Sequence, residues 1–503
     1  MTQTSAGAGD TPNRLFSGYD SVGSGMLSSS AVLGDHEHGG GRNALNIQVC
    51  ESVGELAEAL EIDGSLSVSY LKAVNVTAKM KFMKSLNVTE KSVTIVVYAA
   101  QETGTWRVTD ASLKAGIEPP TDDKAAARFV RSYGDSFIKE ATQGGEYYAV
   151  YTFRTATQKE QSSLTSALKA EGIYSGMTAK ADVQAKISSF VSKTSVDWTL
   201  KQEMTGITGV ALPGEDKLIE FALAFSSKTM NAPVTTGFAI QYYENIPGFG
   251  DGFGKVTANR RHFLGARGVL ASLARLKGVE HQIRRLNDIY ACYRFEDPEL
   301  DALRAKVEAD LETVEDQVDA WRDNPTGNFA KPVLPSLASG EPVLDFAAGQ
   351  PASFGNEGGG TFDFMSVGDA FRNRVRIASI RLADGTWNDH HVIRRIEVEY
   401  ASEKGRWTRI HGQDGNSREK FFLEDGQFPS LLRIHHGTYV DAIEIQLDDG
   451  RSTSAGGGGG VPTDWRPGPG AVVLGFAGRA AAAVDQIKII HGALKKARYV
   501  KSG

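Results

Sequence analysis

A short pattern of apolar and polar residues recurs three times in the C-terminal part of the chain. Its copies begin at Ile393, Val440 and Val484, which places them 47 and 44 residues apart. Each copy is typical of a β-strand, and glycine-rich segments that favour turns separate the copies. Self-similarity at such a period indicates one supersecondary unit in three copies that bury a common core. The sequence therefore predicts an all-β domain of three sheets around a pseudo-threefold axis.

The length and composition of the chain limit what the remainder can be. Its 503 residues are too many for one hydrophobic core, so two or three domains are expected. A hydrophobic content of 41%, a charged content of 23% and a net charge of −6 are typical of a globular protein and argue against binding nucleic acid by bulk electrostatics. Two cysteines, Cys50 and Cys292, give no disulfide framework.

Sequence signals for membrane insertion and export are not recognised. No apolar run approaches the ~20 residues of a membrane-spanning helix. The first residues contain neither a basic region nor an apolar one, so no secretory signal peptide is expected. We therefore expect a soluble protein that stays in the cytoplasm until release or is secreted by a non-classical route, and that meets a target-cell membrane from water.

A helical segment and a linker precede the repeats. After Asp297-Pro298, an expected helix start, apolar residues alternate by three and four positions, which predicts a helix packed against its own domain rather than a partner-binding coiled coil. These residues are Leu300, Leu303, Val307, Leu311, Val314, Val318 and Trp321. We expect one domain at residues 1–325, including a helical segment at 255–325, then a linker at 326–345 and a second domain at 346–495.

The segment from Tyr133 to Phe153 changes character at a glycine pair. An amphipathic run ends at Gly144-Gly145, and many of the residues that follow are aromatic or β-branched, as in a half-buried strand. Adjacent glycines favour a sharp backbone bend, because only glycine takes a positive φ without steric cost. The sequence thus predicts a helix, a bend at the glycine pair and then a strand.

The spacing within this segment resembles the signature of the membrane attack complex/perforin (MACPF/CDC) superfamily of pore-forming proteins, which reads Tyr-Gly-Thr/Ser-His-Phe/Tyr, six residues and Gly-Gly. The matching positions are Tyr133, Gly134, Phe137, Gly144 and Gly145. Asp135 replaces Thr/Ser and Ser136 replaces His. The resemblance implies an α+β N-terminal domain, in which a bent four-stranded antiparallel sheet is flanked by helical clusters. The expected strands are Ser65–Leu71, Ser92–Ala100, Tyr147–Thr155 and Leu218–Phe225.

This resemblance also implies a mechanism. Members of the superfamily bind a surface, oligomerise into a ring through the edges of the sheet, and unfold two helical clusters into β-hairpins that form a transmembrane β-barrel. The clusters are expected at about residues 72–91 and 156–195, where apolar and polar residues alternate as an inserting strand requires. The apolar members are Val74, Val76, Ala78, Met80 and Phe82 in the first stretch and Ala179, Ala181, Val183, Ala185 and Ile187 in the second.

Alternatives stay open for both stretches. A membrane strand needs ~9–11 residues, so two strands and a turn barely fit in residues 72–91, and residues 66–100 could instead form a strand hairpin of the core. Residues 179–187 could be an ordinary polar helix. The resemblance makes Gly144-Gly145 the hinge at which the sheet opens. A bulky residue there is expected to block the rearrangement more than it harms the monomer fold.

The C-terminal repeats resemble the jacalin-related lectins, whose fold is the β-prism. The resemblance rests on the opening Gly358–Phe364, on the closing sequence that ends at Gly492 and on the threefold repeat. It implies carbohydrate-binding loops of the form Gly-x-x-x-Asp, in which the carboxylate accepts hydrogen bonds from sugar hydroxyls. The candidate carbohydrate-binding residues are Gly360, Gly437, Tyr439, Asp441 and Asp485.

The three repeats match this loop to different degrees. In the second repeat, Gly437 to Asp441 fits in full, whereas in the third repeat Asp485 is kept and Ala481 replaces the glycine. In the first repeat Arg394 stands where the aspartate is expected, so no sugar site is expected there. The alternative is that the two aspartates only cap turns.

Together these features favour a toxin-like, pore-forming protein that a lectin-like domain directs to a membrane. The alternative is a non-lytic protein that binds glycans or lipids with the same domains. The expected partners are a membrane lipid or glycan receptor and further copies of the chain in a ring, with a second protein component left open and no nucleic acid. No phosphate loop, catalytic constellation or cysteine-rich zinc spacing is recognised, so we expect no enzymatic activity, no cofactor and no metal.

Overall fold

The computed structural model describes residues 14–501, apart from residues 63–76, 90, 156, 175–180, 195 and 404. The chain divides into two compact units. Unit 1 comprises residues 1–281 and 304–340, and unit 2 comprises residues 282–303 and 341–503. This division does not test the expected linker at 326–345 or the domain boundaries on either side of it, so they stay predictions.

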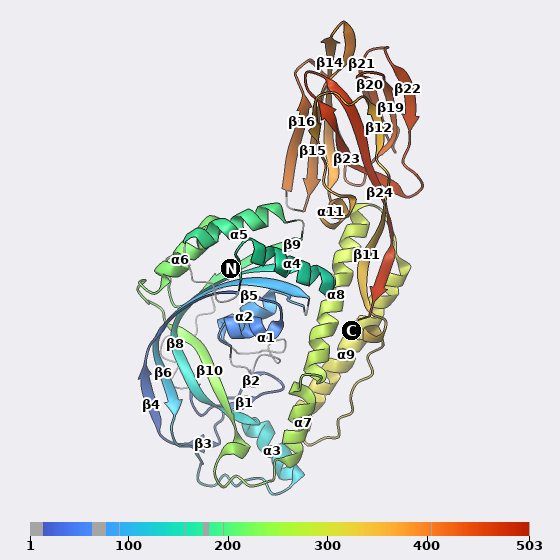
Figure 1. The fold of residues 1–503 in the computed structure, drawn as a ribbon. Helices are drawn as coiled ribbons and strands as arrows, with labels where there is room; N and C mark the ends of the chain where they lie inside the picture. The colour runs from blue at the N-terminus through green and yellow to red at the C-terminus, as the bar shows by residue number, and fades with distance from the viewer. Residues whose placement is uncertain are drawn as a thin grey trace. The chain divides into compact units, whose positions relative to one another are not determined.

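The centre of unit 1 is an antiparallel sheet with two long inner strands, β6 (Ser92–Val108) and β8 (Ser136–Arg154). These strands span 17 and 19 residues, well beyond the usual ~3–10. Consecutive shorter strands pair along the outer edge of each: β4 (His36–Gly40) and β5 (Asn43–Cys50) with β6, and β10 (Val234–Tyr242) and β9 (Asp197–Met204) with β8. Figure 1 shows that the sheet is strongly bent along the length of β6 and β8.

Helices cover both faces of this sheet. Successive strand residues point to opposite faces, so Tyr98 and Tyr148 pack in one core whereas Tyr147 and Tyr151 pack in the other. The first core also takes in α1 and α2, which lie inside the curve of the sheet in Figure 1, and the second takes in α4, α5 and α6. These helices are α1 (Val53–Ala59), α2 (Ala78–Ser85), α4 (Gln158–Ala170), α5 (Ala181–Lys193) and α6 (Leu218–Phe225). Within the described part of the chain, none of the helices combines the length and the apolar character of a membrane span.

The expected strands are confirmed only in part. Ser92–Ala100 and Tyr147–Arg154 belong to β6 and β8, whereas Ser65–Leu71 lies outside the described residues. The expected strand at Leu218–Phe225 is wrong, because this segment is the helix α6. Its buried residues follow helical spacing, and a short apolar run does not reveal its period without knowledge of the neighbours. The buried residues of α6 are Leu218, Ile219, Ala222 and Phe225.

The helix predicted to end at the glycine pair ends ten residues earlier. Helix α3 (Asp123–Tyr133) begins where the Asp122 carboxylate accepts a hydrogen bond of 2.7 Å from Ala125 N, and it stops at Gly134, which has a φ of 78°. From Ser136 onward the chain is strand, because β6 and β10 pair with it on both sides. The glycine pair therefore lies within one continuous strand rather than between a helix and a strand.

Further α-helices follow β10 and precede the three repeats. They are α7 (Gly254–Leu264), α8 (Val269–Cys292), α9 (Pro298–Asp323) and the short α10 (Pro335–Ala338). The seven residues predicted to form the apolar face of a helix lie in α9 and are all buried. This confirms the packed helix that the three-and-four spacing predicts.

Unit 2 contains three antiparallel sheets, one for each repeat, in its described residues. The first repeat contributes β14 (Arg376–Trp387), β15 (His390–Ser402), β16 (Gly405–Gly412), β17 (Asn416–Ser417) and β18 (Phe421–Phe422). The second contributes β19 (Pro429–His436), β20 (Val440–Leu447), β21 (Ser452–Gly456) and β22 (Val461–Trp465). The third combines β11 (Glu341–Ala348), β12 (Ala352–Gly355) and β13 (Gly360–Phe362) with β23 (Ala471–Ala480) and β24 (Val484–Val500). The predicted three-sheet, all-β architecture is confirmed, with one short helix, α11 (Val367–Arg372), added.

Candidate functional site

The three repeats of unit 2 share one backbone geometry at the end of each sheet. Gly355, Gly412 and Gly456 all have a positive φ, of 96°, 91° and 110°. A Cβ atom at any of them would overlap the carbonyl oxygen of one residue on the neighbouring long strand. Those residues are Asp485, Arg394 and Asp441, in the same order. The structure thus places these three side chains at equivalent positions.

Two of the equivalent positions carry buried carboxylates. Asp441 is 6% exposed and Asp485 is 8% exposed. Asp485 Oδ2 is buried without a hydrogen-bond partner. Burial raises the pKa of both groups; His390, His435 and His436 oppose the shift at Asp441, and Arg479 opposes it at Asp485. A buried carboxylate with these features is stabilised when a ligand supplies hydrogen-bond donors to it.

Glycines line both carboxylates. A Cβ atom at Gly358 or Gly359 would lie 2.5 Å from an Asp485 carboxylate oxygen. A Cβ atom at Gly459 or Gly460 would lie 2.9 or 2.5 Å from an oxygen of Asp441. Side chains at these four positions would fill the space beside the carboxylates, so the glycines keep it open.

The other sequence-predicted sugar residues lie near these carboxylates but contact them less. A Cβ atom at Gly360 would meet only Ala480 O, at 3.8 Å, so Gly358 and Gly359 are the glycines of that run that adjoin Asp485. Gly437 lies beside Asp441, because a Cβ atom at Gly437 would lie 3.9 Å from Asp441 Oδ2. The hydroxyl of Tyr439 lies 3.1 Å from Asn388 Nδ2. A glycine run alone did not reveal which member would approach the carboxylate.

In unit 1, the strand that pairs with the outer edge of β8 changes at Gly144 and Gly145. Before the pair, β8 is flanked by β10, and after it by β9. The opposite strand has a bulge between Glu102 and Gly104 at the same level. A Cβ atom at Gly144 would overlap Gln101 O, and one at Gly145 would lie 2.7 Å from Thr205 O. A larger residue at either position therefore strains the monomer itself, and whether it blocks the rearrangement more than it harms the monomer fold stays a prediction.

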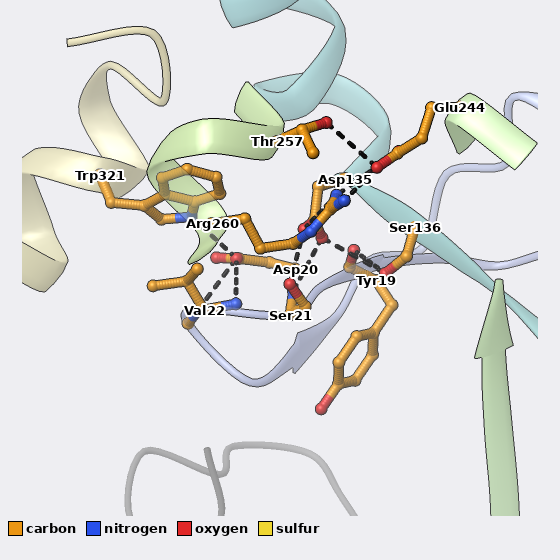
Figure 2. Close-up of polar contacts among 11 residues, drawn as sticks. Tyr19, Asp20, Ser21, Val22, Asp135, Ser136, Glu244, Thr257, Arg260 and Trp321 are labelled. Carbon is orange, nitrogen blue, oxygen red and sulfur yellow. Dashed lines mark hydrogen bonds and ion pairs between the residues drawn. The ribbon is translucent and has the colours of Figure 1, made fainter. Parts of the chain in front are cut away.

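The two departures from the perforin-type signature form a buried polar network (Figure 2). Asp135 and Ser136 are both fully buried. Asp135 accepts hydrogen bonds from Ser21 N at 2.9 Å and Ser21 Oγ at 2.6 Å, and Arg260 Nη1 lies 3.4 Å from its Oδ2. Burial raises the pKa of Asp135 to about 6, against the opposing effects of Arg260 and Ser21.

Arg260 and Trp321 extend this network to helices far along the chain. The Arg260 guanidinium also donates to Glu244 and lies 3.6 Å from the centre of the Tyr242 ring. Trp321 Nε1 donates to Asp20 Oδ1 at 3.0 Å (Figure 2). The start of the sheet is thereby joined to α7 and α9. Sequence spacing marked the position of Asp135, but not the arginine 125 residues away that contacts it.

The other signature residues pack around the same end of the sheet. Tyr133 ends α3, and its carbonyl accepts a hydrogen bond of 2.9 Å from the hydroxyl of Tyr243. The buried Phe137 ring lies 5.6 Å from the Tyr243 ring. A Cβ atom at Gly134 would overlap the backbone of Tyr19. The signature thus marks a close-packed junction in the monomer.

A second buried charge lies directly after the glycine pair. Lys79 of α2 forms an ion pair with Glu146 of β8, and the Tyr98 hydroxyl donates to the same Oε1 at 2.7 Å. Burial raises the pKa of Glu146, although Lys79 acts against the shift. In the sequence, Lys79 is only a polar member of an alternating stretch, because burial of a lysine depends on contacts far away in sequence.

The candidate membrane-inserting residues are helical where the structure describes them. Met80 and Phe82 are buried on α2, which excludes a plain strand hairpin over residues 78–85, and Ala78 is partly buried. On α5, Val183 and Ile187 are buried and Ala185 is exposed. Ala181 begins α5, and its side chain is not described. The candidates outside the described residues are Val74, Val76 and Ala179.

Comparison with known proteins identifies part of unit 2. The model of the Jacalin-like lectin domain family matches residues 352–490, and these residues form a jacalin-like lectin domain. Malaysian banana lectin is 20% identical, covering 29% of this chain and 96% of its own, with a TM-score of 0.24. A mannose-binding jacalin-related lectin from Ananas comosus is 15% identical, covering 30% and 99%, with a TM-score of 0.24. The lamprey immune protein is 22% identical, covering 28% and 43%, with a TM-score of 0.24. No curated protein matches the chain.

Proposed function

We propose that the protein binds glycans through its C-terminal domain and forms pores in the membranes that carry them. The observation that carries the first part is the pair of equivalent, buried carboxylates of Asp441 and Asp485, of which Asp485 Oδ2 has no hydrogen-bond partner. The second part is supported by the arrangement of the helical connections in unit 1.

Asp441 and Asp485 suit the recognition of sugar hydroxyls. An ionised carboxylate is an acceptor only, and leaving it buried without a donor costs free energy. Turn capping does not account for Asp485 Oδ2, which is buried without a hydrogen-bond partner. A sugar with two adjacent hydroxyls supplies the missing donors, and the loop glycines leave it room.

The helical connections of unit 1 leave the same end of the sheet. One joins β5 to β6 across residues 51–91, and the other joins β8 to β9 across residues 155–196. Register supports this placement, because Ser92 pairs with Arg154, which in turn pairs with Asp197. Each connection, drawn out as two strands, would continue an existing antiparallel ladder.

Both connections are long enough for this conversion. A membrane-crossing strand takes ~9–11 residues, so about 20 residues and a turn suffice for a hairpin. The first connection starts at residue 51 rather than at residue 72, which removes the shortage of chain expected from the sequence. Oligomerisation of several copies side by side would then bring the hairpins together in a pore.

The α5 sequence fits both states. As a helix it buries Val183, Ile187, Phe190 and Val191 against the sheet, at helical spacing. Drawn out as a strand, Val183, Ala185 and Ile187 would share an apolar face, while Gln184 and Lys186 would face water.

Binding to a panel of immobilised neutral glycans tests the lectin part. Asp441→Asn and Asp485→Asn should each weaken binding, and the double variant should abolish it, because an amide replaces an acceptor oxygen with a donor. Asp449→Asn, in the turn after β20, is the matched control and should bind as the unchanged protein does. Full binding by the double variant would show that neither Asp441 nor Asp485 takes part in glycan binding.

A further inference from the structure

The first repeat of the lectin domain keeps the geometry of the sugar loops but reverses their charge. Arg394 occupies the position of the two aspartates. Its carbonyl accepts a hydrogen bond of 3.0 Å from Gln413 N, as Asp441 O does from Gly457 N and Asp485 O does from Asn356 N, also at 3.0 Å. The structure therefore contains a third loop of the same form, at a position where the sequence predicts no sugar site.

The glycine that keeps the loop open is retained in this repeat. Gly358 and Gly459, each three residues after a positive-φ glycine, adjoin the two carboxylates. Gly415 stands three residues after Gly412, and a Cβ atom there would lie 3.0 Å from Arg394 Cβ. The small residue beside the recognition side chain is thus common to all three loops, while the side chain differs.

The guanidinium of Arg394 uses only part of its capacity to donate hydrogen bonds. Its Nη1 donates to Thr386 O at 3.1 Å, and its Nε is buried without a hydrogen-bond partner. Among the described residues, no carboxylate forms an ion pair with it. Nearby, Arg418 pairs with the buried Asp384 at 3.0 Å, so that carboxylate is already neutralised by another guanidinium. The loop carries a positive charge where its two counterparts carry a negative one.

An exposed aromatic ring adjoins the guanidinium. The β14–β15 hairpin continues past the point where the other repeats turn, and Trp387 lies near its tip. Trp387 is 37% exposed, and the centre of its ring lies 5.2 Å from Arg394 Cζ. An exposed indole presents a flat apolar face with little entropy to lose, which suits stacking against the ring of a pyranose.

We infer that the first repeat binds an acidic saccharide, whose carboxylate or sulfate pairs with Arg394 and whose ring stacks on Trp387. A planar guanidinium with free donors matches both anions, and such charge-assisted hydrogen bonds are the stronger kind. The inference deepens the proposed glycan binding by adding a ligand class that the carboxylate sites would repel. It places acidic and neutral sugars on different repeats of one domain.

Affinity measurements with the full chain test this assignment. The probes are one neutral galactoside, its 3-sulfated form and galacturonic acid. Arg394→Gln should lower affinity for both acidic probes about tenfold or more and leave the neutral probe unchanged, since a hydrogen bond to a charged group contributes ~1.5–3 kcal/mol. Arg409→Gln, an exposed arginine on the adjacent strand β16, is the matched control and should change neither.

The outcomes separate this inference from the proposed function. Asp441→Asn/Asp485→Asn should lose the neutral probe and keep the acidic ones. Equal binding of the acidic probes by wild type and Arg394→Gln, or their loss in the aspartate variant alone, would overturn the assignment to Arg394. Neutral binding without any acidic binding refutes this inference only, whereas failure of every probe refutes the proposed glycan binding as well. The sulfate and carboxylate arms show which anion the loop prefers.

Discussion

Lys79 Nζ lies 2.6 Å from Glu146 Oε1, and the two side chains are only 4% and 2% exposed. The pair joins α2, in the first helical connection, to β8 at the residue after the glycine pair. It is therefore a contact that must break if the connection is to leave the sheet. Removing one partner leaves the other charge buried and unpaired, which is costlier than removing both.

Lys79→Met should lower the free energy of unfolding of unit 1 by about 3–5 kcal/mol at neutral pH, measured by urea unfolding. Burial already raises the pKa of Glu146, and loss of Lys79 raises it further. The deficit should therefore shrink as the pH falls and Glu146 takes up a proton. Lys81→Met, on the exposed side of the same helix, is the control and should have little effect. Lys79→Met/Glu146→Gln should recover much of the loss, and no recovery would contradict the role of the pair.

Asp135→Asn should alter the pH dependence of stability. The pKa of Asp135 is raised from 3.8 to about 6 in the folded protein, so the carboxyl favours folding in acid and this contribution is lost as the pH rises between those values. The shift corresponds to on the order of 3 kcal/mol. Relative to wild type, Asp135→Asn should gain about that much stability between pH 4 and pH 7. Urea unfolding at each pH measures the stability of both proteins. Identical pH profiles for wild type and Asp135→Asn would show that Asp135 does not titrate in this range.

Gly144→Ala should destabilise the monomer, because its Cβ would overlap Gln101 O in the adjacent strand. We expect a loss of about 1–3 kcal/mol, typical of overpacking. Gly237→Ala is the matched control, since Gly237 lies in the neighbouring strand β10 and a Cβ there meets nothing within 4 Å. Thermal unfolding of both variants gives the comparison, and equal melting temperatures would mean that the bend tolerates a side chain.

The sequence predicted the lectin domain better than unit 1. The period of the copies at Ile393, Val440 and Val484 marks equivalent strand positions, and period and strand pattern together are enough to define three sheets. The sequence predicts a strand at Leu218–Phe225 because its eight residues, seven of them apolar, carry no clear period. Packing against β6 and β8 makes the segment a helix. Local pattern thus sufficed where the fold repeats and failed where tertiary contacts decide.

Candidate site residues were predicted where a loop motif contains them and missed where distant segments meet. Asp441 and Asp485 stand in the loop pattern, so their type and spacing identify them. The third loop was missed because Arg394 breaks the pattern, although Gly412 and Gly415 keep its backbone geometry. The pairing of Lys79 with Glu146 spans 67 positions and has no sequence signal.

Labelling α5 with an environment-sensitive dye tests the conversion from helix to strand. Single cysteines at Gln184, Ala185 and Lys186, in a background without the two native cysteines, would each carry the dye. On addition of vesicles, emission should shift toward an apolar environment at Ala185 and not at its two neighbours, because alternate strand residues face lipid and water. Unchanged emission at all three positions would mean that α5 stays outside the membrane.

Imaging the 503-residue chain on vesicles while recording dye release tests pore formation most directly. Phosphatidylcholine vesicles with and without a mixed ganglioside fraction would supply membranes that differ in their sugars. We predict ring-shaped oligomers and release of the dye on the ganglioside vesicles only, both lost in the variant Asp441→Asn/Asp485→Asn/Arg394→Gln. Bound protein without rings and without release would contradict pore formation and favour a non-lytic glycan-binding protein.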